Sequence, residues 1–332
     1  MQSQQLTKSL THKSYLDAGT AIPFTLPNDC GALSTGHIWE ITKPHKETAS
    51  SNRHNKKWIC KWVGETNKEN IIQAESEVIA QEWIRFFMPW HPKTRYWIRN
   101  NDIYILSEKI SNFRSFRNIL TETESSFIQM IEASLEDLAE TLIICAWLDE
   151  DDLHCQNIGF NAQNKIVKLD GGLCFASLFL HSRHHDITQA DLSNFISLTN
   201  YSPHHWLFKN EENYIDISKY ANYPRFQHGL NRGLAKIITL PNTFIQCFID
   251  AYRDDIKLPS VRVMSLIKRK QMLARIVSDF DSFQEYYQSD LRINDLDNYH
   301  EQIKTFKTMS HFVLWDQTPN IVSFRSARAI KK

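Results

Sequence analysis

The order in which hydrophobic patterns follow one another constrains the fold of this chain most. Most strand-type segments lie before Ser111, and from there onward the apolar spacing is mostly helical. With 42% hydrophobic residues in 332, the chain has enough apolar side chains for a full-sized core. The sequence therefore predicts an α+β fold: a small lobe of sheet and one helix, followed by a larger α-rich lobe.

The first lobe begins with a predicted hairpin. His37–Thr42 has strand-type composition, and Trp58–Val63 alternates apolar and polar side chains as a half-buried strand does. The polar stretch Lys43–Lys57 between them is expected to be a long exposed loop. Ile71–Met88 has helical spacing, and two prolines just after it predict where that helix ends.

Two more strands are predicted at Arg95–Ile98 and Ile103–Leu106, joined by a turn-type sequence. Further on, Ser134 with Asp137 three residues later is typical of a helix N-terminus, with Asp in place of the usual Glu. Further helices are expected around residues 186–200, 242–254, 260–288 and 295–313.

Charge and cysteine usage exclude several classes of protein. The 38 basic and 38 acidic residues cancel, so no overall charge draws the chain to nucleic acid or membrane. Six cysteines without a C-x-x-C pair indicate free thiols in a reducing compartment. The apolar run Leu142–Leu148 is far shorter than the roughly 18 residues of a membrane span. With no signal-peptide pattern at the N-terminus either, we expect a soluble cytosolic protein.

Only nine glycines occur in the chain, and neither of the two common glycine-rich phosphate-binding patterns is present. Gly31 and Gly36 are the only glycines shortly before the Trp58–Val63 segment. Any nucleotide site must therefore be built differently from a P-loop or a dinucleotide-binding turn.

The spacing of three polar residues carries the strongest chemical signal. Asp152 and Asn157 are 157 − 152 = 5 residues apart, and Asp170 follows 170 − 157 = 13 residues later. Asp170 ends an apolar strand-type run and precedes two glycines. Carboxylate and amide oxygens are the ligands that Mg²⁺ prefers, and phosphoryl transfer depends on such cations and on positioning.

The sequence Asp152-x-His154-x-x-Asn157 with Asp170-Gly171 resembles the remote branch of the protein-kinase superfamily. The loop is similar to those of phosphoinositide 3- and 4-kinases and of atypical bacterial kinases. The resemblance covers about Ile38–Phe175 and implies a two-lobed protein-kinase-like fold, with an N-lobe at 1–108 and a C-lobe with a helical C-terminal extension at 109–332.

The resemblance also implies roles for individual residues, with ATP and Mg²⁺ (or Mn²⁺) as cofactors. Asp152 would be the catalytic base, and Asn157 and Asp170 the metal ligands. Lys61 would bind the α/β phosphates, and Glu77, with Glu75 as the alternative, would position it. Ser107, in the expected last strand and hinge Tyr104–Lys109, is assigned to nucleotide binding. Two roles stay open for His154: orienting or sharing the proton of Asp152, or making a structural hydrogen bond.

The sequence departs from the family pattern after Asp170. Asp170-Gly-Gly replaces the usual Asp-Phe-Gly, and the ending of a regular activation segment is absent. The residues that match the catalytic part of the family pattern are therefore all present, whereas the part that recognises a peptide substrate cannot be identified in this sequence.

A basic window lies at Ile256–Ser278, where six basic residues occur without an acidic one. Two interpretations stay open: a solvated helix face, or a site for an inositol polyphosphate, a phosphoinositide headgroup or an anionic membrane. Nucleic acid is not favoured, because no aromatic residues are interleaved with the basic ones. The candidate polyanion residues are Arg262, Lys268, Arg269, Lys270 and Arg275.

The sequence thus predicts an ATP-dependent phosphotransferase, with a protein hydroxyl as acceptor and an inositol lipid or other small alcohol as the alternative. A pseudokinase scaffold and the transfer of another part of ATP are the competing hypotheses. The resemblance to atypical bacterial kinases further implies an effector delivered into a host cell.

Overall fold

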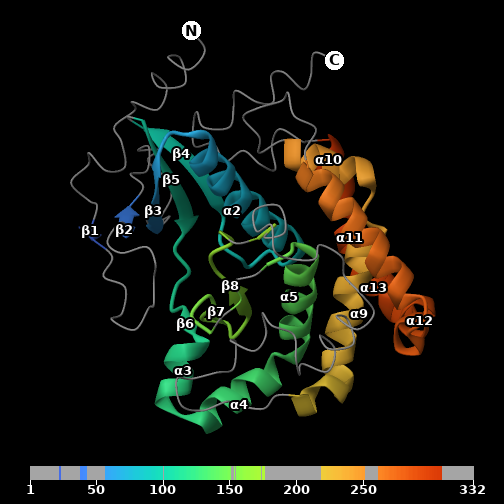
Figure 1. Cartoon of the computed structure of the whole chain (residues 1–332). Coiled ribbons are helices and arrows are strands. Elements are labelled where there is room, and N and C mark those ends of the chain that lie inside the picture. Colours follow the sequence, from blue (N-terminus) through green and yellow to red (C-terminus); the bar gives the residue numbers. More distant parts are fainter. Residues whose placement is uncertain are drawn as a thin grey trace, which may run out of the picture.

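This computed structural model describes residues 22–23, 38–42, 57–99, 101–150, 153, 155–172, 174–175, 218–250 and 261–308. Within them, a small antiparallel sheet with one helix precedes a mainly helical region, which confirms the α+β class (Figure 1). The helix expected at 186–200 lies outside the described residues. No helix among the described ranges combines the length and the apolar character needed to cross a membrane.

The N-terminal sheet is antiparallel throughout. Its strands lie in the order β1-β2-β3-β5-β4. Their bounds are β1 Ile22–Pro23, β2 Ile38–Thr42, β3 Lys57–Glu65, β4 Thr94–Arg99 and β5 Asp102–Glu108. The pairing of β2 with β3, which opposes Ile38 to Lys61 and Thr42 to Lys57, confirms the predicted hairpin. β5 pairs with both β3 and β4, so it is an inner strand of the sheet.

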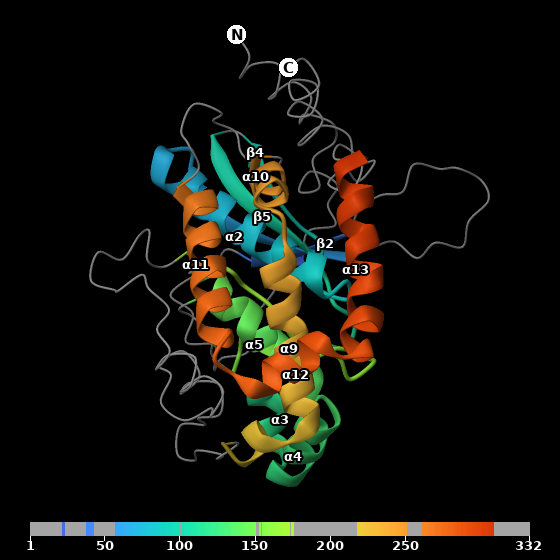
Figure 2. The ribbon, with the colours of Figure 1, turned by 90° about the vertical axis from the view of Figure 1, so that its right-hand side faces the viewer.

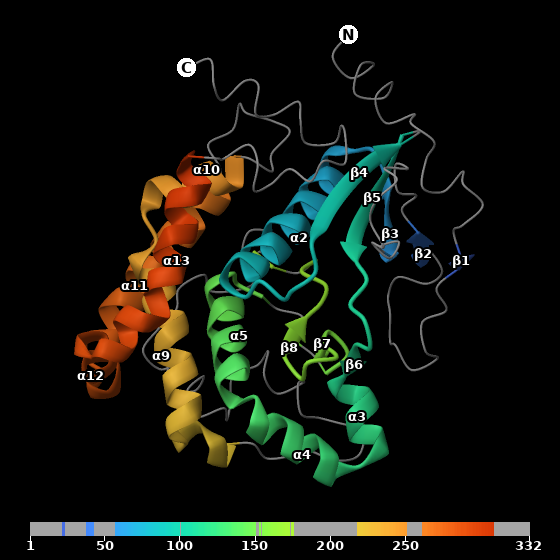
Figure 3. The same cartoon turned by 180° about the vertical axis from the view of Figure 1, so that it is seen from behind.

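Helix α2, Lys68–Phe87, packs against this sheet (Figure 3). The side chain of Asn67 accepts a hydrogen bond from the Asn70 N–H and caps its first turn, so the helix begins three residues before the expected start. Its C-terminus follows the prediction, since Pro89 comes two residues after Phe87 and cannot continue the helix. Most of the helix from Ala74 to Phe87 is buried.

The chain then forms a second, smaller sheet and three helices. The strands, in the order β6-β7-β8, are β6 Arg114–Ser115, β7 Ile158–Phe160 and β8 Ile166–Lys168. The helices are α3 Phe116–Glu122, α4 Glu124–Ala133 and α5 Leu135–Trp147. Ser134 lies at the N-terminus of α5 as predicted, but its hydroxyl donates to the Asn164 carbonyl and does not cap the helix. That contact ties α5 to the β7–β8 hairpin instead.

Within the described residues from 218 onward, the elements are helical: η1 Ser218–Asn222, α9 Pro224–Thr239, α10 Asn242–Asp250, α11 Val261–Val277, α12 Asp281–Gln288 and α13 Asp290–Thr308. The prediction of one helix at 260–288 is wrong, because a turn at Ser278–Phe280 separates α11 from α12. Here the Ser278 hydroxyl donates to the Arg275 carbonyl and competes with helical bonding. Figure 2 shows α9, α11, α12 and α13 grouped on one side of α2 and α5.

One hydrophobic core joins the two regions. Trp83 of α2 is fully buried and stacks on Phe248 of α10, with ring centroids 3.8 Å apart. The same indole meets Trp147 of α5 edge-on at 5.2 Å. Aromatic contacts of this kind add to the area that each ring buries. The helix that borders the N-terminal sheet is therefore packed into the helical region as well.

Candidate active site

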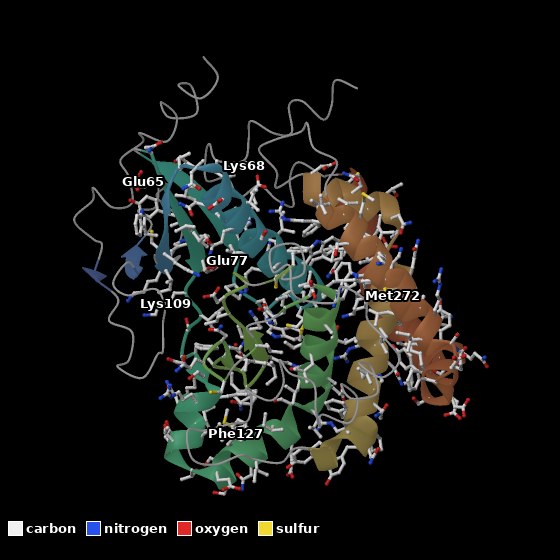
Figure 4. The ribbon with its side chains drawn as sticks, in the orientation of Figure 1. Glu65, Lys68, Glu77, Lys109, Phe127 and Met272 are labelled. Atoms are coloured by element: carbon white, nitrogen blue, oxygen red, sulfur yellow. The ribbon has the colours of Figure 1, made fainter. Side chains whose placement is uncertain are left out.

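Strand β3 and helix α2 bring one lysine and one glutamate together. Lys61 is paired within the sheet to Ile105 of β5 and Ile38 of β2, so its backbone is fixed from both sides. Its Nζ donates to Oε2 of Glu77 at 3.0 Å. Glu77 belongs to α2 and is only 4% exposed; Figure 4 shows it on the side of α2 that faces β7 and β8. Glu75, the alternative partner, points instead toward Arg262 of α11.

Asp170 joins this pair from the end of β8. Lys61 Nζ lies 3.1 Å from its Oδ2 and 3.3 Å from its Oδ1. The Gly172 N–H donates to Oδ1 at 3.0 Å. Asp170 adopts a left-handed backbone conformation, with φ of 55°, which aspartate adopts more readily than most residues other than glycine. Lys61, Glu77 and Asp170 form what we call the Lys61 cluster.

The carboxamide of Gln81 stabilises this turn. In the orientation that matches its neighbours, its oxygen accepts from the N–H groups of Asp170 and Gly171, both at 3.1 Å, and its nitrogen donates to the Lys168 carbonyl. Gln81 lies one helical turn after Glu77 on α2. The same helix therefore positions both Glu77 and the segment that carries Asp170.

The Lys61 cluster carries one more negative than positive charge when both carboxylates are ionised. Burial would raise the pKa of Asp170, but the charges of Lys61 and Lys168 and the Gly172 N–H lower it to about 2. Burial and the Asp170 charge raise the pKa of Glu77 to about 7, against the opposing effect of Lys61. Burial opposes the charge on Lys61, yet the two carboxylates raise its pKa above the ordinary value. The cluster can therefore accept a further cation.

The two glycines after Asp170 leave room beside the carboxylates. A Cβ on Gly172 would lie 3.2 Å from both Asp170 Oδ1 and Glu77 Oε2. A Cβ on Gly171 would lie 3.1 Å from the Ala80 Cβ and 3.3 Å from the Glu77 carbonyl. Side chains at these positions would fill the space beside both carboxylates and press on α2. Glycine at position 171 therefore allows close packing against α2, and glycine at position 172 keeps a side chain away from the carboxylate oxygens.

Asn157 lies at the same end of the β7–β8 hairpin as Asp170. Ile158 pairs with Lys168, and beyond that pair the Asn157 carbonyl accepts from the Leu169 N–H at 2.6 Å. The pairing thus sets Asn157 opposite the residue before Asp170. An ionised carboxylate and an asparagine at the same end of the hairpin are residue types that suit Mg²⁺.

Protein side chains alone do not complete a metal centre in the described ranges. No group of three or more His, Cys, Asp or Glu side chains there is arranged to hold a metal ion. Mg²⁺ in phosphate-transfer sites is commonly held by one or two protein ligands plus the phosphates of the substrate. Asp170 and Asn157 are the two residues that would supply protein ligands to such a cation.

Asp152 and His154, for which the sequence predicts catalytic roles, lie outside the described residues. Of the residues beside them, Leu153 is 1% exposed, and the Cys155 carbonyl accepts from the Arg117 N–H at 3.0 Å. Cys155, which precedes β7, is therefore held beside α3. Burial raises the pKa of the Cys155 thiol, which does not favour a nucleophilic role.

A buried ion pair lies next to the Lys61 cluster, two residues before Asp170, and the sequence analysis did not predict it. Lys168 and Glu150 are completely buried, with Nζ 2.6 Å from Oε2. The Cys174 thiol donates to the same oxygen at 2.9 Å. Glu150 follows α5, Lys168 precedes Asp170 by two residues and Cys174 follows it by four. The sequence feature that could have predicted this pair is the lysine inside the apolar run Ile166–Leu169, because a charge in a buried strand needs a partner.

Ser107 lies inside strand β5, and its hydroxyl is 3.1 Å from the Thr94 hydroxyl. Its backbone is paired on both sides, with Ile59 of β3 and Thr94 of β4. The strand ends at Glu108, and the Lys109 N–H still donates to the Lys57 carbonyl. The sheet therefore holds the Ser107 backbone, and the segment that leaves it begins after Lys109.

The five basic residues predicted as a polyanion site do not share one exposed face. Arg262 and Arg269 are 8% and 3% exposed. The Arg269 guanidinium donates to the carbonyls of Ala146 and Trp147 at the end of α5. Lys270 Nζ donates to the Leu240 carbonyl at 2.7 Å, and Lys268 and Arg275 lie on the exposed side of α11.

These contacts correct the prediction of a single basic patch. At least three of the five cations bind helix ends or a neighbouring helix, where a lysine or arginine satisfies free carbonyl groups. A charge window in the sequence does not reveal which helix face points inward.

Comparisons with known proteins give a distant structural likeness. No family model matches the sequence, and no curated protein matches it. Among solved structures, the chain is similar to the proinflammatory kinase CtkA of Helicobacter pylori at 15% identity, with a TM-score of 0.43. The likeness covers 80% of this chain and 96% of that one. The chemistry of the Lys61 cluster therefore has to be inferred from its own geometry.

Proposed function

We propose that this chain is an ATP-dependent phosphotransferase. The observation that carries the proposal is the Lys61 cluster: one ammonium held 3.0 Å from Glu77 and 3.1 Å from Asp170. The three residues come from β3, α2 and the end of β8, and are up to 170 − 61 = 109 positions apart. A lysine fixed by a buried glutamate, next to an ionised aspartate with space beside it, suits the binding of a metal-bound polyphosphate.

Each residue has a separate task in this proposal. Lys61 binds the α/β phosphate oxygens, and Glu77 holds the lysine in reach of them. Asp170, together with Asn157, binds Mg²⁺ or Mn²⁺, which would neutralise charge on the phosphates when bound. Asp152 accepts the proton of the attacking hydroxyl, and His154 assists it or supports the loop. The finer form of the proposal is an atypical Ser/Thr protein kinase acting as a bacterial effector, with an inositol lipid or small alcohol as the alternative acceptor.

The test is transfer of label from γ-labelled ATP in the presence of Mg²⁺, to the protein itself and to a generic protein acceptor. The Asp170→Asn variant removes the charge of the metal ligand, whereas Asp297→Asn removes an exposed charge on α13 and is the matched control. We expect label with the wild type and the control and none with Asp170→Asn. Asp152→Ala should lower the rate by about 10²–10⁴-fold if it is the base.

Mass spectrometry of the labelled product separates the competing reactions. Added phosphate supports phosphoryl transfer, whereas added adenylate would show that the nucleotidyl part is transferred. ATP binding without any transfer would favour a pseudokinase scaffold.

A further inference from the structure

Arg262 connects the C-terminal helical region to the helix that carries Glu77. It is the second residue of α11 and is 8% exposed. Figure 2 shows the upper part of α11 beside α2, and the contacts of Arg262 place the two helices against each other. An arginine buried at this level needs partners for its charge and its donors.

The partners of Arg262 lie on one face of α2. Its Nε and Nη2 donate to the Ser76 hydroxyl at 3.1 and 2.8 Å, and Nη2 also donates to the Ile72 carbonyl at 2.8 Å. Its Nη1 is 3.5 Å from Oε2 of Glu75. The Ser76 hydroxyl in turn donates to the Ile72 carbonyl. Ile72 and Ser76 are four residues apart, so the guanidinium contacts two successive turns.

This anchor lies directly before Glu77 in the sequence. Successive residues of an α-helix are separated by about 100° around the axis, so Ser76 faces α11 while Glu77 faces Lys61. A rotation of α2 that turned Glu77 away from Lys61 would also pull Ser76 and Ile72 away from Arg262. The two contacts therefore favour the same setting of the helix.

Arg262 also reaches the segment that follows Asp170. Its guanidinium carbon lies 6.0 Å from the centre of the Phe175 ring, five residues after Asp170. Phe175 is fully buried, and its N–H donates to the Leu148 carbonyl at 2.9 Å. A cation over an aromatic face at this distance is a favourable contact. One side chain thus touches both segments that supply carboxylates to the Lys61 cluster.

We infer that Arg262 is a positioning residue for the Lys61 cluster: it sets the rotation of α2 through Ser76 and Ile72, so that Glu77 stays on Lys61. This role rests on the proposed phosphotransfer, because it assigns the helical region a part in that reaction. It predicts that the contact of α11 with α2 raises the rate of phosphotransfer. It also predicts that losing this contact lowers the rate by displacing Glu77 from Lys61.

The test uses two mild substitutions, since removal of the whole guanidinium would leave Glu75 buried without this partner and could unfold the region. Arg262→Lys keeps the charge but loses the guanidinium that bonds two successive turns of α2, and Ser76→Ala removes only the hydroxyl. Met264→Ala is the control, because this side chain is 66% exposed on the same helix. Each is made in the wild type and in Glu77→Gln, and the single-turnover rate with γ-labelled ATP is measured.

We expect Arg262→Lys and Ser76→Ala to lower the rate roughly tenfold or more in the wild type and less than about twofold in Glu77→Gln. Met264→Ala should change neither rate. Equal losses in both backgrounds would show that Arg262 does not act through Glu77, and no loss in the wild type would show that it has no part in the reaction. Either result overturns the inference.

Hydrogen exchange of the α2 amides separates this inference from the proposed function. If the wild type transfers no label, the phosphotransfer proposal fails, and the exchange measurement still tests the anchor. Faster exchange at residues 74–80 in Arg262→Lys than in Met264→Ala would support an anchor on α2. Unchanged exchange would overturn it.

Discussion

At the scale of single residues, the central feature is that two carboxylates share one ammonium. Lys61 Nζ is within 3.1 Å of both Glu77 and Asp170, so the pair of carboxylates is only half neutralised. The more exposed Asp170 stays ionised, with its pKa lowered to about 2, while the buried Glu77 has its pKa raised to about 7. Protonation of Glu77 or binding of a further cation would each relieve the excess negative charge.

We predict that Glu77→Gln stabilises the protein at pH 8 while impairing its reaction. The pKa of Glu77 rises from 4.5 to about 7 on folding. Its contribution to stability is therefore greatest below pH 4.5 and is lost as the pH rises through 7. Urea unfolding should show Glu77→Gln more stable than wild type by about 1–3 kcal/mol at pH 8, with a smaller difference at pH 5. A variant less stable at pH 8 would contradict this charge balance.

Gly172 is predicted to be required for ligand access and dispensable for folding. A methyl group there would lie 3.2 Å from an oxygen of Asp170 and of Glu77. Gly172→Ala should weaken Mg²⁺-dependent ATP binding by about 10- to 100-fold, because small displacements of reacting groups are costly. Calorimetric titration measures the affinity, and urea unfolding of the same sample is the control. Unchanged affinity would show that ligands do not enter beside these carboxylates.

At the scale of elements, α2 is the part on which the site depends. Glu82 fixes it to the sheet, with its carboxylate 2.9 Å from Arg95 and accepting from the Thr94 N–H at 2.7 Å. His91, just after the helix, ties it to β8: its Nε2 accepts from the Lys168 N–H and its Nδ1–H donates to the Met88 carbonyl, both at 3.1 Å. This bonding requires a neutral imidazole.

The His91 contact predicts an acid-sensitive fold. Burial lowers the pKa of His91 to about 3 from 6.5, the Met88 carbonyl opposing this and the Lys168 charge adding to it. The unfolded chain binds the proton first, so stability is full above pH 6.5 and falls as the pH drops toward 3. Between pH 6.5 and 5, wild type should lose about 2 kcal/mol more than His91→Gln. Parallel slopes in urea unfolding at these two pH values would refute the assignment.

The packing of α5 on α9 depends more on Gly229 than on Gly233. A Cβ on Gly229 would overlap the backbone of Glu136, whereas a Cβ on Gly233 would meet a methyl group of Ile143. A side-chain end can move aside, but a helix backbone cannot without separating the helices. Gly229→Ala should destabilise the protein by about 1–3 kcal/mol, and Gly233→Ala by less. Thermal unfolding of the two variants tests this order, and the reverse order would contradict the contact.

At the scale of the whole molecule, the sequence predicted the parts whose signals are local. Alternation predicted β3, and apolar spacing with Pro89 predicted α2, because both elements bury one regular face. Loop spacing pointed to Asp170 and Asn157, and the strand before α2 pointed to Lys61. The structure brings Lys61, Glu77 and Asp170 together, while the residues between Glu150 and Cys155 that would complete the site are only partly described.

The sequence analysis did not predict the features that depend on contacts between distant parts of the chain. Helix α9 was missed because Gly229 and Gly233 weaken its helical pattern, and their value lies in close packing on α5. Arg269 looked like part of an exposed charge run, yet its partner carbonyls come from a helix end about 122 positions earlier. Buried polar partners of this kind are set by tertiary packing, which no window of sequence contains.

The measurement that tests the central claim most directly is the affinity for ATP with and without Mg²⁺, by calorimetric titration of wild type, Asp170→Asn and Asp297→Asn. If the Lys61 cluster binds a metal-bound polyphosphate, Mg²⁺ should tighten binding at least about tenfold in wild type and in the exposed control, but not in Asp170→Asn. A wild type that binds ATP equally well without Mg²⁺, or an Asp170→Asn variant that keeps the Mg²⁺ effect, would contradict the account.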